Sequence, residues 1–167
     1  MKLLTFSVLA KLDDNIDTDV MSPVKYMTSY EPSYLGTIAL KDLDPDFTTK
    51  MAPGGILVAG SNFGCGSSRE TAPIALKAAG TKLILAEEFA RIFYRNALNI
   101  GMPCIVCPGI HDSANIGDKL EVDLSGGTVH NLTSGKILQG TPIPLELMEQ
   151  FEAGGLMELL QNKFLKR

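Results

Sequence analysis

Two serines and an arginine follow a glycine-rich turn in the middle of this chain, and together they could bind an anion. The turn runs from Gly60 to Gly66, and Ser67, Ser68 and Arg69 come directly after it. Glycines let the backbone take positive φ angles and approach a ligand closely. Arginine offers a planar pair of donors that matches a carboxylate, and serine hydroxyls can donate beside it. The pattern therefore predicts a carboxylate or phosphate site.

A helix is expected to follow this segment, but the sequence leaves its first residue open. Ser67 and Glu70 have the spacing of a capping box, in which the two residues satisfy each other's backbone N–H groups. A helix that began there would aim its free N–H groups and its positive dipole at an anion. Pro73 lacks the backbone donor that a helix interior needs. Either the helix kinks at Pro73, or it begins later, near Thr71.

Apolar runs and helical spacing around the turn predict the scaffold that positions it. Short apolar runs at 55–60, 82–86 and 103–106 are typical of buried strands. Helical patterns over 74–79 and 89–100 connect these strands, and each is followed by a glycine that can end a helix. Strand–helix–strand–helix–strand is a βαβαβ arrangement, so the three strands should be parallel.

The flanking segments add β-structure and helices to this centre, and we expect one α/β domain over residues 1–167. Turn signals and alternation of apolar and polar residues define the added elements. They are an opening strand at 3–12, a long loop with short helical turns at 20–53, a hairpin of 120–124 and 128–132, a short strand at 137–138 and a helical tail at 145–164.

Composition excludes several classes of protein. The net charge is -4 and the basic residues are scattered, which argues against nucleic acid, because affinity there comes mostly from neutralised phosphates. No apolar run reaches the roughly 18–20 residues of a membrane span. The N-terminus lacks the pattern of a signal peptide, and three cysteines form no disulfide pattern. We therefore expect a cytoplasmic protein with neither nucleic acid nor membrane as a partner.

A dinucleotide site fits the glycine turn less well than a carboxylate site. Gly64 and Gly66 begin a G-x-G-x-x-G pattern, but Arg69 stands where the third glycine belongs. Glu87 or Glu88 follows at about the distance of the acidic residue in that fingerprint. The match is incomplete, so this interpretation is weak.

The cysteines could be taken for cluster ligands, because Cys104-x-x-Cys107 and Cys65 make three thiols. Cys104 and Cys107 fall in or beside a short strand, however, and an odd separation points them to opposite faces. We expect no metal site in this chain.

Three segments resemble the aconitase superfamily. Residues 62–70, Asn-Phe-Gly-Cys-Gly-Ser-Ser-Arg-Glu, resemble the signature of the small subunits of isopropylmalate isomerase and homoaconitase, and of the swivelling C-terminal domain of aconitase. The acidic segment 14–19 and the helical segment 89–101 resemble two further motifs of that family, in the same order. The resemblance covers most of the chain and implies an aconitase-type swivelling β/β/α domain.

The resemblance implies a subunit of a hydro-lyase that is active only with a large subunit, as a heterodimer or heterotetramer. The large subunit would hold a [4Fe–4S] cluster, and this chain would hold no cofactor. The reaction on a small dicarboxylate is dehydration, then rehydration at the neighbouring carbon. By the same resemblance, Ser67 would be the base, as an alkoxide, and Ser68 and Arg69 would bind a substrate carboxylate.

Other residues of the matching motifs would support the site. Asn62, Gly64 and Gly66 shape the turn. Asp17 and Asp19 could hold a serine, an arginine or groups of the partner subunit, or they could hydrogen-bond their own turn. A structural role near the site is favoured for both.

In this family a loop after the acidic motif reads the variable group of the substrate. Here that loop should be residues 23–30, and the residues expected to contact substrate are Tyr26, Met27, Thr28 and Ser29. Homoaconitase-like members carry an arginine where Thr28 stands, and Lys25 is the nearest basic residue. This favours an alkyl group, as in the isopropylmalate of leucine biosynthesis, over a carboxylated arm.

Two alternatives stay open. The chain could be the small subunit of a homoaconitase or of a dimethylmalate or methylmalate dehydratase, since these share the same architecture. In a different class, it could be a stand-alone module that binds a dicarboxylate or a nucleotide without any partner.

Overall fold

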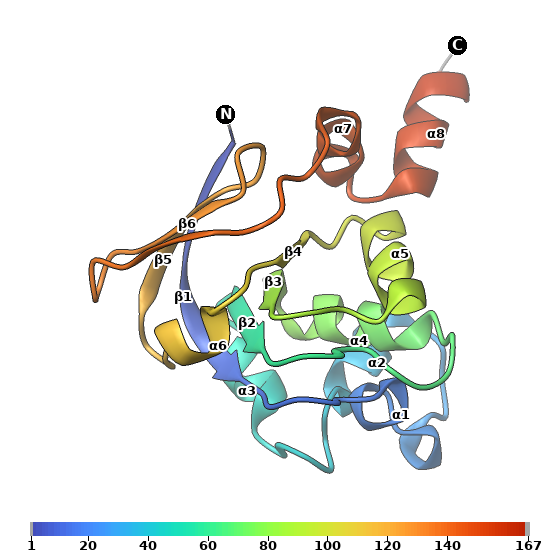
Figure 1. Cartoon of the computed structure of the whole chain (residues 1–167). Coiled ribbons are helices and arrows are strands. Elements are labelled where there is room, and N and C mark those ends of the chain that lie inside the picture. The colour runs from blue at the N-terminus through green and yellow to red at the C-terminus, as the bar shows by residue number, and fades with distance from the viewer. Residues whose placement is uncertain (1, 166–167) are drawn as a thin grey trace.

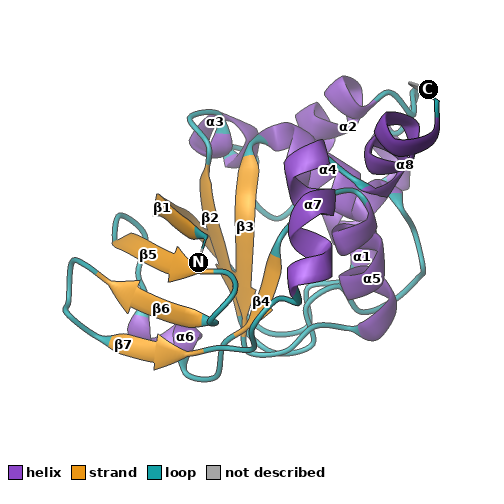
Figure 2. Cartoon of the chain, turned by 90° about the horizontal axis from the view of Figure 1, so that it is seen from above, coloured by secondary structure: helices purple, strands orange, loops and turns teal. Residues whose placement is uncertain are grey.

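A computed structural model describes residues 2–165 of the chain. Its centre is one seven-stranded sheet (Figure 1), and the strand order β4-β3-β2-β1-β5-β6-β7 can be followed in Figure 2. The strands are β1 (Leu3–Lys11), β2 (Gly55–Ala59), β3 (Thr81–Ala86), β4 (Cys104–Val106), β5 (Lys119–Asp123), β6 (Thr128–Asn131) and β7 (Ile137–Gln139). The helices are α1 (Thr18–Met21), α2 (Pro32–Ile38), α3 (Phe47–Met51), α4 (Thr71–Ala79), α5 (Arg91–Asn99), α6 (Ile110–Ser113), α7 (Leu145–Ala153) and α8 (Leu156–Phe164), with a 3₁₀ turn, η1, at Val24–Tyr26.

Strand β1 belongs to both halves of the sheet. Its first half, from Leu3 to Ser7, pairs antiparallel with β5, and its second half pairs parallel with β2. The register shifts between Val8 and Ala10, and an irregularity of this kind bends a strand. The sheet therefore turns: β1–β4 form the parallel centre, and β5–β7 swing away from the helices that cover it (Figure 2).

The parallel strands bury both of their faces, which explains their uninterrupted apolar runs. Side chains alternate between the faces along a strand. Leu57 and Ile84 enter a core shared with α2, α4 and α5, whereas Val58 and Leu85 enter a second core shared with β5, β6 and α7. Two apolar layers thus hold the sheet, and the loops at the carboxyl ends of its parallel strands stay free to form a site.

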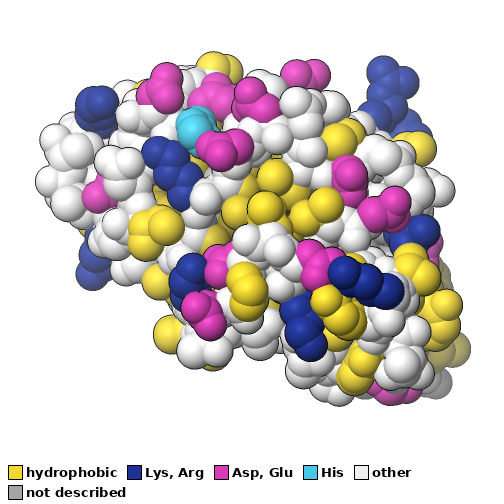
Figure 3. Space-filling view, turned by 90° about the horizontal axis from the view of Figure 1, so that it is seen from below, with side chains coloured by type: hydrophobic (Ala, Val, Ile, Leu, Met, Phe, Trp, Pro, Cys, Tyr) yellow, Lys and Arg dark blue, Asp and Glu magenta, His cyan; other side chains and the backbone are white. Residues whose placement is uncertain are grey.

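The predicted strands and the parallel βαβαβ centre are confirmed, with shifts of a residue or two at their ends. The segment 20–53 carries more helix than the short turns expected, because α2 and α3 both lie within it. No helix within the described residues combines the length and apolarity that a membrane span requires. Lys, Arg, Asp and Glu side chains are interspersed on the face shown in Figure 3.

The helix after the glycine turn begins at Thr71, so a start at Ser67 is wrong. Glu70 precedes the helix without a side-chain capping bond, and the capping box is not formed. Pro73 is the third helical residue, where no backbone N–H has a partner inside the helix in any case. Proline at this position therefore neither costs a hydrogen bond nor kinks α4.

Candidate functional site

Three loops meet at the carboxyl ends of β1, β2 and β3, and backbone hydrogen bonds join them. The N–H of Gly64 donates to the carbonyl of Ile16 over 2.8 Å, and that of Phe63 donates to the carbonyl of Glu88 over 3.0 Å. This edge is where open α/β sheets bind ligands. The fold thus brings together the three segments whose motifs stand far apart in the sequence.

The glycine turn between these loops has the unusual backbone that its sequence predicts. Gly64 and Gly66 have φ angles of 87° and 95°, and Asn62 has a φ angle of 56°. A Cβ atom on Gly64 would lie 2.2 Å from the ring of Phe93, so no side chain fits there. The amide of Asn62 donates to the side chain of Asn15 over 3.0 Å, which ties the turn to the acidic loop.

Ser67 lies on the surface, and a buried threonine holds it from beneath. The hydroxyl of Thr18 donates to the carbonyl of Ser67 over 2.9 Å and lies 3.1 Å from its Oγ atom. Thr18 is 1% exposed, whereas Ser67 and Ser68 are exposed. No signal in the sequence predicts this contact, because Thr18 stands within the acidic motif, 49 residues away.

The two aspartates of the acidic motif have different surroundings. Asp17 caps α1, and its carboxylate accepts the N–H of Val20 over 2.8 Å. Asp19 instead lies 3.0 Å from Nη1 of Arg69. That contact lacks hydrogen-bond geometry. Nη1 is also shielded from solvent, and its donors have no hydrogen-bond partner among the described residues. Asp17 therefore shapes its own turn, and Asp19 faces the arginine.

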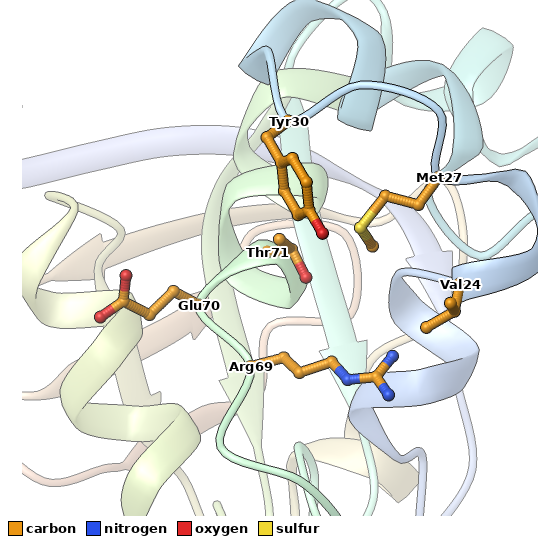
Figure 4. A pocket seen from close by; sticks show the side chains of 6 residues that line it. All are labelled: Val24, Met27, Tyr30, Arg69, Glu70 and Thr71. Atoms are coloured by element: carbon orange, nitrogen blue, oxygen red, sulfur yellow. The ribbon is translucent and has the colours of Figure 1, made fainter.

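Arg69 stands at the rim of an open pocket of about 580 Å³. Its lining side chains are Val24, Met27, Tyr30, Arg69, Glu70 and Thr71 (Figure 4). In this view Glu70 points away from the other five, and the hydroxyl groups of Tyr30 and Thr71 turn toward the space in front of Arg69. The Thr71 hydroxyl is buried and has no hydrogen-bond partner among residues 2–165. Val24 and Tyr30 belong to the loop 23–30 that the sequence predicts to read the substrate, whereas the sequence indicates Thr71 only as a possible start of the helix.

Of the four loop residues predicted to contact substrate, only Met27 lines the pocket. The hydroxyl of Tyr26 donates to Asp42 over 2.6 Å, and Tyr26 lies outside the pocket lining. The hydroxyl of Ser29 accepts the N–H of Glu31, and Thr28 is exposed outside the lining. The wall that this loop gives to the pocket is therefore largely apolar.

Glu87, one of the two acidic residues considered for the incomplete dinucleotide fingerprint, has another role. The carboxylate of Glu87 accepts the N–H groups of Gly109 and His111, each over 2.8 Å. Both oxygens of Glu87 thus bind the start of α6, so Glu87 is not free to bind a ribose, whereas Glu88 is exposed.

The thiols do not fit a cluster held by this chain. Cys104 lies in the core that faces α4 and α5, and Cys107 lies in the core on the opposite face of the sheet, as their spacing predicts. Burial raises the pKa of both thiols, that of Cys107 to about 11, which disfavours the thiolate that a metal needs. Among residues 2–165, no three Cys, His, Asp or Glu side chains gather as metal ligands would.

Known proteins share this arrangement over nearly the whole chain. The family model of the aconitase C-terminal domain matches residues 14–108. The chain is 50% identical to the isopropylmalate/citramalate isomerase small subunit of Methanocaldococcus jannaschii, over 92% of this chain and 91% of that one. It is 49% identical to the 3-isopropylmalate dehydratase small subunit of Caldicellulosiruptor bescii, over 93% and 94% of the two chains.

A solved structure agrees with these similarities. The crystal structure of a 3-isopropylmalate dehydratase from Methanocaldococcus jannaschii superposes with a TM-score of 0.88 at 35% identity, over 99% of this chain and 97% of that one. Sequence, fold and the arrangement of the loops thus lead to the same group of proteins. The chain belongs to the aconitase C-terminal domain family and, within it, to the small subunits of 3-isopropylmalate dehydratase, hydro-lyases that work together with a large subunit.

Proposed function

We propose that this chain supplies the base and a carboxylate-binding site to a cytoplasmic 3-isopropylmalate dehydratase, which interconverts 2- and 3-isopropylmalate in leucine biosynthesis. One observation carries the proposal: the partly exposed Arg69 lines a pocket together with the apolar Val24 and Met27, and the exposed Ser67, which lies outside that lining, precedes Arg69 by two residues. A dicarboxylate with a branched alkyl arm matches this combination of groups.

Ser67 would take the proton from the carbon next to a carboxylate, and Arg69 with Ser68 would hold that carboxylate. A serine hydroxyl is a very weak base, so its alkoxide needs positive charge and hydrogen bonds nearby. Arg69 lies two residues away, and its guanidinium, which Asp19 faces over 3.0 Å, supplies positive charge. The hydroxyl of Thr18, 3.1 Å from Ser67 Oγ, can also donate to it. The start of α4 contributes less than expected, because it lies four residues further on.

We propose that the large subunit carries a [4Fe–4S] cluster and closes the site of this chain. The thiols of this chain do not fit such a cluster, and Ser67 and Ser68 open onto solvent. When bound, the cluster would supply a Lewis acid for the leaving hydroxyl. A heterodimer or a heterotetramer would meet this requirement.

The charges around the pocket favour an alkyl arm over a third carboxylate. Arg69 is the one basic residue among the lining side chains. The ammonium group of Lys25 is paired with Asp42 over 2.8 Å instead of entering the pocket. Citramalate, named for the Methanocaldococcus relative, has a methyl group where isopropylmalate has an isopropyl group, so it is a second candidate for the same wall.

The test is to co-express this chain with its cluster-bearing large subunit under anaerobic conditions and to follow the alkene by ultraviolet absorbance. Isopropylmalate, citramalate, dimethylmalate and homocitrate would be offered in turn. We expect turnover of isopropylmalate only when both chains are present. If the two chains associate but turn over homocitrate in preference, the alkyl assignment is wrong. If they do not associate, a stand-alone binding module becomes the better interpretation.

A further inference from the structure

Asp42 fastens the loop that forms the apolar wall of the pocket. Its two carboxylate oxygens bind different residues of that loop: Oδ1 accepts the hydroxyl of Tyr26 over 2.6 Å, and Oδ2 lies 2.8 Å from Nζ of Lys25. Asp42 follows α2, outside both the acidic motif and the glycine turn. Nothing in the reaction chemistry described above involves it.

The charges around this contact reinforce it. The Lys25 ammonium, which donates to the carboxylate, holds the pKa of Asp42 below its usual range, and the Tyr26 hydroxyl adds to the effect. The ammonium groups of Lys25 and Lys41 lie 4.9 and 4.8 Å from the centre of the Tyr26 ring, within the range of cation–π attraction. The hydroxyl of Tyr34 donates to the Tyr26 carbonyl over 2.5 Å. Tyr26 is therefore held on its ring, its hydroxyl and its backbone.

The residues on either side of this anchored pair face the pocket. Val24 and Met27 both line it, and the N–H of Met27 donates to the Val24 carbonyl over 2.9 Å, which closes the turn. Lys25 and Tyr26 lie between them in the chain, outside the pocket lining, and both bind Asp42. The same short turn thus places two apolar side chains in the pocket lining, while the ammonium group of Lys25 binds Asp42 outside that lining.

We propose that Asp42 is a specificity-determining residue, which keeps the Lys25 ammonium out of the pocket so that the pocket accepts an alkyl arm and discriminates against a carboxylated one. This inference rests on the proposed function. A free ammonium beside the pocket would pair with a carboxylate on the substrate arm. The same ammonium would gain nothing from an alkyl arm, and contact with it would cost hydration.

The variant Asp42→Asn tests the proposal, because the amide keeps the shape and still accepts the Tyr26 hydroxyl while the charge that holds Lys25 is lost. The complex with the large subunit would be used throughout. The measurements are the KM for isopropylmalate and the inhibition constant of homocitrate, whose arm ends in a carboxylate, against isopropylmalate turnover. Homocitrate inhibition needs no turnover of homocitrate, so the readout exists even if the wild-type complex rejects it as a substrate.

We expect Asp42→Asn to lower the inhibition constant of homocitrate by about two- to fivefold, the upper part of the range for an exposed ion pair, with the kcat for isopropylmalate close to wild type. Adding Lys25→Met should return the inhibition constant to the wild-type value, and Lys25→Met alone should leave it unchanged. Thermal unfolding of each variant would verify the fold.

An unchanged inhibition constant in Asp42→Asn, or a decrease that persists in the double variant, would overturn the role of Asp42 while leaving the proposed function intact. If kcat fell, and the KM for isopropylmalate and the inhibition constant of homocitrate changed by the same factor, Asp42 would only support the loop. If the wild-type complex does not turn over isopropylmalate at all, the proposed function is wrong, and this inference, which rests on it, is wrong as well.

Discussion

The Oγ atom of Ser67 lies 3.1 Å from the hydroxyl of Thr18, so an exposed hydroxyl rests on a buried one. The proton of Thr18 can go to the carbonyl of Ser67, 2.9 Å away, or to its Oγ atom. In the first case the serine is the donor between the two hydroxyls. When the serine has lost its proton, only the second arrangement is available, and it stabilises the anion. The contact therefore positions Ser67 in both protonation states.

Replacing Thr18 by valine should lower kcat by roughly tenfold with little change in KM, because one hydrogen bond to the anionic form of Ser67 is lost. Thr18→Ser keeps the hydroxyl and should restore most of the rate. Steady-state kinetics of the two variants in the complex would measure this, beside thermal unfolding of each. A Thr18→Val enzyme with wild-type kcat would show that the contact is structural only.

Replacing Ser67 by alanine should abolish turnover, with a loss on the order of a thousandfold or more, because no other base lies at this position. The side chain is exposed, so the free energy of unfolding should change by no more than about 0.5 kcal/mol. Ser68→Ala is the matched control: it should raise KM and retain more of kcat. Activity close to wild type in Ser67→Ala would remove Ser67 from the mechanism.

Replacing Arg69 by lysine should raise KM by about tenfold and lower kcat, since a single ammonium cannot hold a carboxylate with two parallel hydrogen bonds. Asp19→Asn should have a smaller effect in the same direction, because Asp19 only faces the guanidinium, over 3.0 Å. Initial rates over a range of substrate concentrations would give kcat and KM for both variants. Equal effects of the two substitutions would mean that the ion pair, and not substrate contact, accounts for the role of Arg69.

Because two thiols are buried, we expect the free energy of unfolding to fall at alkaline pH. Burial raises the pKa of Cys107 to about 11, and the nearby charge of Glu87 contributes as well. The folded chain therefore keeps the proton when the unfolded chain has lost it, and this contribution to stability is fully present below the ordinary thiol pKa of about 9. It disappears as the pH rises from there to about 11. Urea unfolding across that interval should show the decline, and Cys107→Ala should reduce its slope.

Short-range patterns predicted most of the fold. The apolar runs at β2, β3 and β4 and the helical spacing between them led directly to parallel strands, because continuous apolar runs need cover on both faces. The spacing of Cys104 and Cys107 also predicted their opposite faces. The start of α4 stayed ambiguous, since a capping box and a proline gave conflicting signals within a few residues. A capping bond forms only if the backbone around Ser67 turns into the helix, and the glycine turn holds it elsewhere.

The sequence alone thus determined the elements, their order and the segment that carries the serines and the arginine, because these depend on residues close together along the chain. Tertiary structure decided which residues meet: Thr18 beneath Ser67, Asp19 opposite Arg69, and Tyr26 turned to Asp42 while Val24 and Met27 line the pocket. The first two contacts join segments that follow different strands, β1 and β2, and the third lies within the long connection from β1 to β2. Their geometry depends on how β1, β2 and the helices pack, and a change of one residue in loop register would place different side chains in the site.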